Sequence, residues 1–207
     1  MHHDLGCLGA AAFDRAIERR LRVLKEIGFN AVRLSHNPHA PRLLDMCDRL
    51  GLLVIDEAYD KWPEFSPDGD AWRDDLRSFL RRDRNHPSVV LWSVGNEVAQ
   101  QGKPEGSELL RAMVGFVHHE EPSRLVTCAL HPARAADQTL QDMAHHMDVV
   151  SLNYSGLLYE EDHRNHPGIV LLGSEIAPWN TFIFEEGKEN KFDTWTRDHS
   201  WVETPEY

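Results

Sequence analysis

Two glutamates follow strongly apolar segments of the chain and could together carry out acid–base and nucleophilic chemistry. Glu97 ends the run VVLWSVGNE, and Glu175 ends the run LLGSE. Two carboxyl groups about 5–5.5 Å apart cleave a glycosidic bond with retention, because one protonates the leaving oxygen while the other attacks the anomeric carbon. We therefore take Glu97 as the candidate acid/base and Glu175 as the candidate nucleophile. Structural ion pairs of two strand-end carboxylates are the alternative.

Other polar residues occupy the same kind of position, directly after a predicted strand. They are His36, Asp56-Glu57, Asn96-Glu97 and Asn153-Tyr154. The Asn96 amide is suited to holding a sugar hydroxyl, and the Tyr154 hydroxyl to orienting a nucleophilic carboxylate. Asp56 and Glu57 are better interpreted as buried carboxylates that orient their neighbours. In a (β/α)8 barrel the carboxyl ends of all strands meet around one mouth, so these residues would converge there.

Apolar periodicity predicts the elements that would position these residues. Helices are expected over 13–27, 41–50, 72–84, 107–119 and 135–145, and strands over 30–34, 52–55, 89–94, 124–128, 148–152 and 169–172. Continuously apolar strands that alternate with helices are typical of a parallel sheet covered on both faces. This pattern fits a barrel or a doubly wound sheet. No glycine-rich phosphate loop follows any strand, which argues against a nucleotide-binding fold.

The fold class expected is therefore α/β, a (β/α)8 TIM barrel that spans residues 1–207 but is incomplete. Only six strands are predicted; the first strand of the barrel and the last strand with its helix are expected to be missing from this chain. A barrel with two open edges exposes its interior. We accordingly expect the isolated chain to fold poorly and to show little activity.

The amino-acid composition limits the classes of partner that we expect. The chain has 34 acidic and 22 basic residues and a formal net charge of −12, which disfavours a nucleic-acid partner. No apolar stretch approaches the roughly 18 residues of a membrane span, so no membrane partner is expected. Thirteen histidines include no HExxH pattern, and the three cysteines include no CxxC pattern. Neither a metal nor another cofactor is expected. Compartment, and a homo-oligomer of the complete protein, are left open.

Six segments, in order, resemble glycoside hydrolase family 2. They are HHDLGCLGAA at 2–11, NAVRLSHNP at 30–38, MCDRLGLLVIDEAYDKW at 46–62, RNHPSVVLWSVGNE at 84–97, SLNYS at 151–155 and LLGSEIA at 171–177. The resemblance extends from residue 2 to about 179, and HPSVVLWSVGNE is its most specific part. The HHDLG and SHNP segments are most similar to β-galactosidases, although β-glucuronidases and β-mannosidases share most of the scaffold.

The resemblance implies a retaining exo-glycosidase that acts on a carbohydrate, with Glu97 as acid/base and Glu175 as nucleophile. It implies further substrate-binding residues: His2, Asp4, His36 and Asn96 around the sugar, and Tyr154 against the nucleophile. Trp179 is a candidate for stacking on a sugar face, with simple packing as the alternative.

Two departures from the family pattern limit the inference. Magnesium-dependent β-galactosidases carry Glu-Thr-His where this chain has residues 59–62, so that metal site is not carried over. The N-terminal β-sandwich domains usual in the family are absent from this chain. A non-catalytic carbohydrate-binding or degenerate barrel is the alternative function, but the presence of both glutamates argues against it.

Overall fold

Six parallel strands form one curled sheet. The structure, a computed structural model, describes residues 1–3, 5–63, 65–66, 68–131, 143–154 and 159–176. Within them the strands pair in chain order from β1 to β6: β1 Ala31–Leu34, β2 Leu53–Glu57, β3 Val89–Asn96, β4 Leu125–Leu130, β5 Val150–Asn153 and β6 Leu171–Glu175. A doubly wound sheet reverses its strand order partway, whereas a barrel keeps it sequential. The order therefore confirms the predicted incomplete (β/α)8 barrel.

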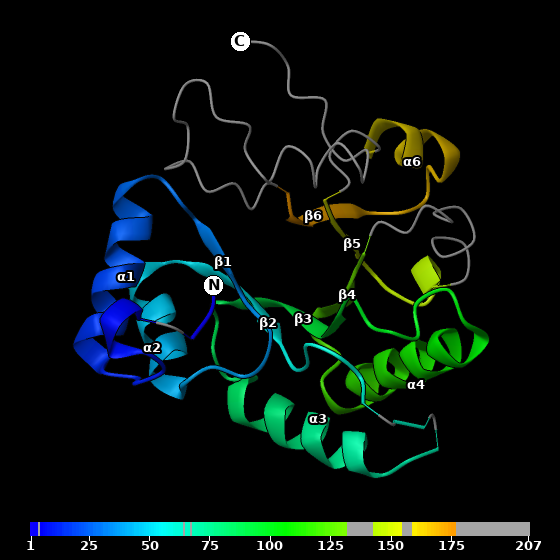
Figure 1. Cartoon of the computed structure of the whole chain (residues 1–207), viewed down its shortest axis with the longest axis horizontal. Helices are drawn as coiled ribbons and strands as arrows, with labels where there is room; N and C mark the ends of the chain where they lie inside the picture. Colours follow the sequence, from blue (N-terminus) through cyan, green and yellow to red (C-terminus); the bar gives the residue numbers. More distant parts are fainter. Residues whose placement is uncertain (4, 64, 67, 132–142, 155–158, 177–207) are drawn as a thin grey trace.

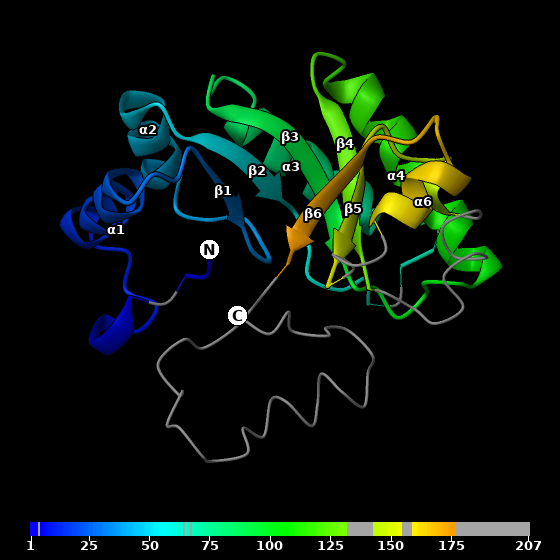
Figure 2. The ribbon, with the colours of Figure 1, turned by 90° about the horizontal axis from the view of Figure 1, so that it is seen from above.

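The helices lie on the convex, outer side of the sheet (Figures 1 and 2). They are α1 Asp14–Glu26, α2 Pro41–Leu50, α3 Ala71–Asp83, α4 Pro104–Glu120 and α6 Tyr159–Asn165; a short 3₁₀ helix, η1 Gly6–Leu8, precedes α1. Glycines follow α1 and α2 with positive φ, 99° at Gly28 and 68° at Gly51, a backbone conformation that glycine adopts without steric cost. The predicted α1 to α4 are confirmed to within a few residues at each end.

Helix α6 was not predicted from the sequence. Helix α6 is seven residues long, and its sequence YEEDHRN has a single apolar residue, so it carries no apolar periodicity to detect. The predicted helix over 135–145 lies mostly outside the described residues.

The core lies between the outer face of the sheet and the helices. Trp92 of β3 is fully buried and makes an edge-to-face contact with Phe79 of α3, at a ring-centroid distance of 5.3 Å. The inner face is covered only in part: Ser93 and Thr127 are each 1% exposed, but the face is open elsewhere. Leu53 and Leu125 belong to this face and are 46% and 52% exposed. The six strands curl only part of the way around a barrel, which fits the exposure of these two side chains.

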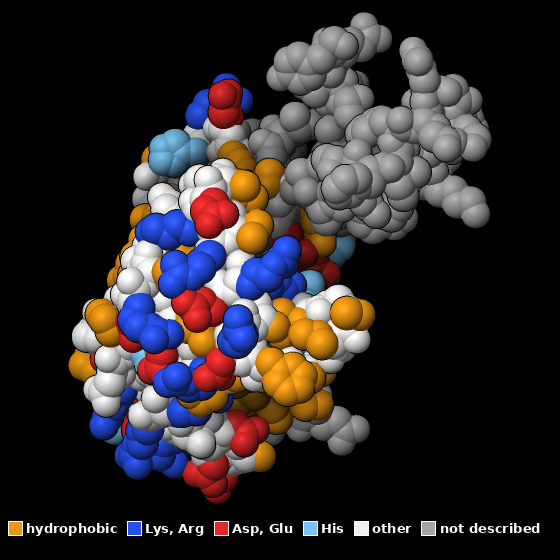
Figure 3. Space-filling model, turned by 90° about the vertical axis from the view of Figure 1, so that its left-hand side faces the viewer, with side chains coloured by type: hydrophobic (Ala, Val, Ile, Leu, Met, Phe, Trp, Pro, Cys, Tyr) orange, Lys and Arg blue, Asp and Glu red, His pale blue; other side chains and the backbone are white. Residues whose placement is uncertain are grey.

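The outer surface over α1 and α2 carries basic and acidic side chains interspersed with one another (Figure 3). Arg22 and Glu18, for example, form an i, i+4 ion pair of 2.7 Å. The thiols of Cys47 and Cys128 are free and buried. Among the described helices none is both long and apolar enough to cross a membrane.

Candidate active site

The candidate nucleophile Glu175 ends β6 and lies half-buried between two hydrogen-bond donors. Its Oε1 accepts a hydrogen bond of 2.8 Å from Nη1 of Arg33, and its Oε2 accepts one from the Tyr154 hydroxyl. Burial raises the pKa of Glu175, but the hydrogen bonds from Tyr154 and Arg33 outweigh burial and hold the pKa below its ordinary value. The carboxyl group is therefore ionised at neutral pH, as a nucleophile must be.

Arg33 of β1 lies at the centre of the site. Its guanidinium donates to Oε2 of Glu57 from both Nε and Nη2, at 3.1 and 2.8 Å. Nη2 also donates to Oδ1 of Asn96 at 2.9 Å. With the bond to Glu175, one side chain connects strands β1, β2, β3 and β6. Arginine suits this role because its five N–H donors are held in a rigid plane.

Glu57 is a fully buried carboxylate beneath the nucleophile. Besides Arg33, it accepts hydrogen bonds from Ser93 Oγ at 2.7 Å and from His36 Nδ1 at 2.7 Å. With Nδ1 directed to Glu57, the other ring nitrogen of His36 points to Glu175, at 3.7 Å from Oε1. This agrees with the prediction that Glu57 orients its neighbours. Its chain neighbour Asp56 faces the opposite side of the sheet.

The candidate acid/base Glu97 follows β3 and is half-buried. Its backbone N–H donates a hydrogen bond of 2.8 Å to the carbonyl oxygen of Ala129. Its Oε1 accepts a hydrogen bond of 2.8 Å from Nδ2 of Asn153. Glu97 and Tyr154 have φ values of 44° and 54°, the left-handed region that non-glycine residues seldom adopt. Such conformations cluster at functional sites, where the surrounding structure holds them.

Asn96 joins the two halves of the site. Its Oδ1 accepts from Arg33 and, at 3.0 Å, from Nδ2 of Asn153, while its own Nδ2 donates to Oδ1 of Asp60 at 3.3 Å. Because Asn153 also contacts Glu97, a single hydrogen-bonded network links the candidate acid/base with the candidate nucleophile.

The structure therefore brings together five of the eight residues proposed from the sequence: His36, Asn96, Glu97, Tyr154 and Glu175. A sixth, His2, is next to them, with its ring edge-on to that of His36 at 5.3 Å between centroids. Asp4 and Trp179 lie outside the described residues. The catalytic and sugar-binding roles of all eight stay predictions.

Arg33 and Asn153 belong to the site but were not among the site residues predicted from the sequence. For Asn153 a signal existed, since it ends a strand as Asn96 does. Arg33 is internal to its strand, and only the curvature of the sheet directs it at Glu175. Such a contact, across 142 positions of sequence, is invisible without the fold.

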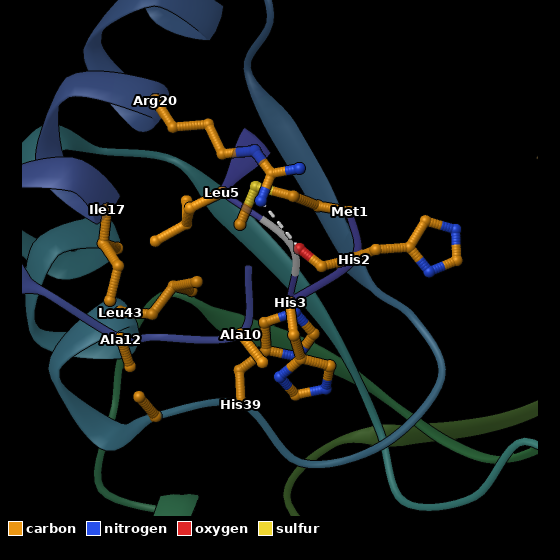
Figure 4. A pocket seen from close by; sticks show the side chains of 11 residues that line it. Met1, His2, His3, Leu5, Ala10, Ala12, Ile17, Arg20, His39 and Leu43 are labelled. Atoms are coloured by element: carbon orange, nitrogen blue, oxygen red, sulfur yellow. Dashed lines mark hydrogen bonds between the residues drawn. The ribbon is translucent and has the colours of Figure 1, made fainter. Parts of the chain in front are cut away.

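A small pocket beside the site does not provide the substrate cavity. It lies between the N-terminal segment, α1 and α2, lined by Leu5, Ile17 and Leu43, while the ring of His2 points away from it (Figure 4). Its volume of about 30 Å³ has room for a water molecule or two, not for a monosaccharide. The candidate active site is the open mouth at the carboxyl ends of the strands.

Residues 59–62, from which no metal site was predicted, contact the end of β3. Lys61 Nζ donates to the carbonyl oxygen of Asn96 at 3.1 Å, and Trp62 Nε1 donates to that of Val94 at 2.7 Å. Among the described residues, no group of three or more His, Cys, Asp or Glu side chains is placed to hold a metal ion.

Fold and site together define a (β/α)8-type barrel with paired carboxyl groups at the carboxyl ends of its strands, where barrel enzymes carry their active sites. The family description "Glycosyl hydrolases family 2, TIM barrel domain" matches residues 2–181. The chain belongs to glycosyl hydrolase family 2.

Relatives in this family carry more than one activity name. A β-galactosidase of Bacteroides ovatus is 40% identical over 192 residues, covering 74% of this chain and 22% of that protein. The β-glucuronidase of Homo sapiens is 33% identical, covering 73% of this chain and 23% of that protein. The crystal structure of a family 2 member from Bacteroides cellulosilyticus superposes with a TM-score of 0.77 at 42% identity, covering 98% of this chain and 26% of that one. The chain thus spans about a quarter of the length of these relatives.

Proposed function

We propose that the complete protein hydrolyses terminal, non-reducing β-glycosides, in first place β-galactosides, by double displacement with retention. The observation that carries the proposal is the environment of Glu175. A carboxylate kept ionised by Tyr154 and Arg33, in one network with a second carboxyl group at Glu97, is what a retaining glycosidase requires. The chain itself supplies the catalytic part of the barrel.

In the first step, Glu97 protonates the glycosidic oxygen while an oxygen of Glu175 attacks the anomeric carbon. The bond between that carbon and the leaving oxygen breaks, the alcohol departs, and a glycosyl ester of Glu175 forms. In the second step, Glu97, now a carboxylate, removes a proton from water. The water oxygen bonds to the anomeric carbon, and Glu175 leaves as a carboxylate.

The choice of sugar in this proposal is supported by both the sequence and the relatives. The segments around His2 and His36 are most similar to β-galactosidases, and the Bacteroides ovatus relative bears that name. His2, Asp4, His36 and Asn96 are proposed as sugar ligands, and Trp179 as a stacking residue. The human relative, a β-glucuronidase, makes β-glucuronides the second candidate.

The test is hydrolysis of 4-nitrophenyl β-galactoside by the complete gene product, beside the β-glucuronide and the β-mannoside. Glu175→Gln should be inactive, since no nucleophile remains. Glu97→Gln should lose about 10²- to 10⁴-fold, the usual contribution of a general acid–base group, and azide should restore part of the rate. A 2-deoxy-2-fluoro galactoside should label the peptide that contains Glu175. A wild type that binds sugars but cleaves none of the three substrates would show a carbohydrate-binding protein instead.

A further inference from the structure

Asn153 joins the candidate acid/base to the strand that carries the nucleophile. It ends β5 and is fully buried. Its Nδ2 donates to Oε1 of Glu97 at 2.8 Å and to Oδ1 of Asn96 at 3.0 Å. Its Oδ1 accepts a hydrogen bond of 2.6 Å from the hydroxyl of Ser174, the residue before Glu175.

The orientation of this amide is fixed by chemistry, although oxygen and nitrogen of an amide look alike in shape. A guanidinium only donates hydrogen bonds, so the Asn96 atom that faces Arg33 must be the oxygen. The same oxygen faces Asn153, which must therefore present its NH₂ group. The remaining Asn153 atom is then the oxygen, and Ser174 must donate to it. Arg33 thereby sets the direction of every bond in this chain of hydrogen bonds.

The fixed amide distinguishes the two oxygens of Glu97. Oε1 always faces an N–H, so a proton placed on Oε1 would oppose that N–H and break the hydrogen bond. The proton of the neutral acid is consequently confined to Oε2. Among the described residues, the side-chain hydrogen bond to Glu97 comes from Asn153.

We propose that Asn153 is a positioning residue that fixes which oxygen of Glu97 carries the catalytic proton, directing the proton from Oε2 to the glycosidic oxygen. This inference rests on the acid/base role proposed for Glu97. Asn153 acts on the glycosylation step, where a proton is delivered. It also stabilises the Glu97 carboxylate that must accept a proton from water in the second step.

The test compares leaving groups in the complete protein, with phenyl and 2,4-dinitrophenyl glycosides of the sugar that the wild type hydrolyses. Phenolate needs protonation to leave, whereas 2,4-dinitrophenolate does not. Asn153→Asp keeps the shape but places an acceptor against Oε1, which draws the proton to the wrong oxygen. We expect kcat/KM for the phenyl glycoside to fall about 100-fold, the scale of general acid catalysis, and for the dinitrophenyl glycoside by less than about tenfold.

The pH profile gives a second readout. The added carboxylate favours the protonated form of Glu97, so the alkaline limb of kcat/KM should move to higher pH in Asn153→Asp. Asn153→Ala, which removes the donor without adding charge, should shift the same limb in the same direction by less. Ser151→Ala is the matched control. Ser151 lies on β5, as Asn153 does, and its buried hydroxyl makes a hydrogen bond of 2.8 Å with Thr127. This bond is not part of the network around Glu97. Its leaving-group ratio and pH profile should equal those of wild type.

Equal losses for both leaving groups with an unmoved alkaline limb would overturn the inference and leave Asn153 a purely structural residue. A wild type that hydrolyses neither glycoside of any sugar tested would overturn the proposed function itself, and this inference with it. The two failures are therefore distinguishable.

Discussion

The nucleophile candidate shows how a partly buried carboxylate is kept ionised. Burial alone would favour the neutral form of Glu175. Two donors reach it from different strands, Arg33 from β1 and Tyr154 from the end of β5, and each contacts a different oxygen. Because both oxygens accept hydrogen bonds, rotation of the carboxyl group is restrained as well.

Removing one donor should move the acidic side of the pH profile. In Tyr154→Phe the pKa of Glu175 is expected to rise, since burial remains and one of the opposing hydrogen bonds is lost. The ionised nucleophile is then lost at a higher pH, so the acidic limb of kcat/KM should shift upward. A hydrogen bond to a charged group contributes about 1.5–3 kcal/mol, which predicts a loss of at least about tenfold in kcat/KM.

Tyr59→Phe is the control for this experiment. Its hydroxyl donates to the carbonyl oxygen of Trp72 at 3.2 Å, outside the site. An unchanged acidic limb in Tyr154→Phe, or an equal shift in Tyr59→Phe, would contradict the role given to Tyr154.

Asp56 and Glu57 are adjacent but have opposite environments, because successive residues of a strand face opposite sides of the sheet. Glu57 faces Arg33 and His36. Asp56 faces α3, where its buried carboxyl group lies beside that of Asp83. Burial, and then the negative charge of Asp83, raise the pKa of Asp56 to about 8, against a smaller opposing effect of Arg82.

This raised pKa predicts a stability that falls with pH. The unfolded value is about 3.9, so between about pH 4 and pH 8 the folded state holds a proton that the unfolded state has released. The contribution of Asp56 to the free energy of unfolding is therefore fully present below about pH 4 and is lost as the pH rises through 8. Urea unfolding of the complete protein at pH 5 and pH 8 should show this loss. Asp56→Asn should flatten it, whereas Asp74→Asn, at an exposed position in the first turn of α3, should not.

At the scale of elements, the end of β3 depends on a close approach that only glycine allows. A Cβ on Gly95 would lie 2.7 Å from Nε1 of Trp62 and 3.1 Å from Cγ1 of Val98. Trp62 is held there by its hydrogen bond to Val94 and cannot easily move. The packing of Trp62 against Gly95 thus supports the strand end that presents Asn96 and Glu97.

Gly95→Ala should therefore destabilise the protein by about 1–3 kcal/mol, as overpacking does, and should lower kcat by displacing Glu97. Gly115→Ala is the matched control, since its Cβ would meet nothing within 4 Å on the exposed face of α4. That change should stabilise by about 0.5–1 kcal/mol, because alanine favours a helix interior over glycine. Denaturant unfolding midpoints of the two variants test this prediction. Equal changes in the midpoint for Gly95→Ala and Gly115→Ala would contradict the role of packing at Gly95.

At the scale of the whole molecule, the six described strands leave part of the inner face exposed and end in the two edge strands β1 and β6. Leu53 and Leu125 are about half exposed on that face, and β1 and β6 are the edge strands. Exposed apolar side chains beside unpaired strand edges promote association.

Residues 1–207 expressed alone should therefore bind a hydrophobic dye, aggregate on heating and hydrolyse glycosides poorly. The complete protein should do none of these. A sharp, reversible thermal transition of the isolated segment, without dye binding, would contradict this expectation.

The sequence by itself determined the elements and the candidate carboxylates. Buried strands of a parallel sheet are continuously apolar, and the polar residue that ends each run marks the mouth of the barrel. Glu97 and Glu175 were found in this way. Helix α6 was not found, because a short polar helix carries no periodic signal.

Only the tertiary structure decided which side chains act on the two glutamates. Arg33 reaches Glu175 and Asn153 reaches Glu97 because the sheet curls, which brings together residues 142 and 56 positions apart. Such contacts depend on curvature and register, which no local pattern encodes. The ionised state of Glu175 and the direction of the amide chain follow from those contacts, and so belong to the fold rather than to the sequence alone.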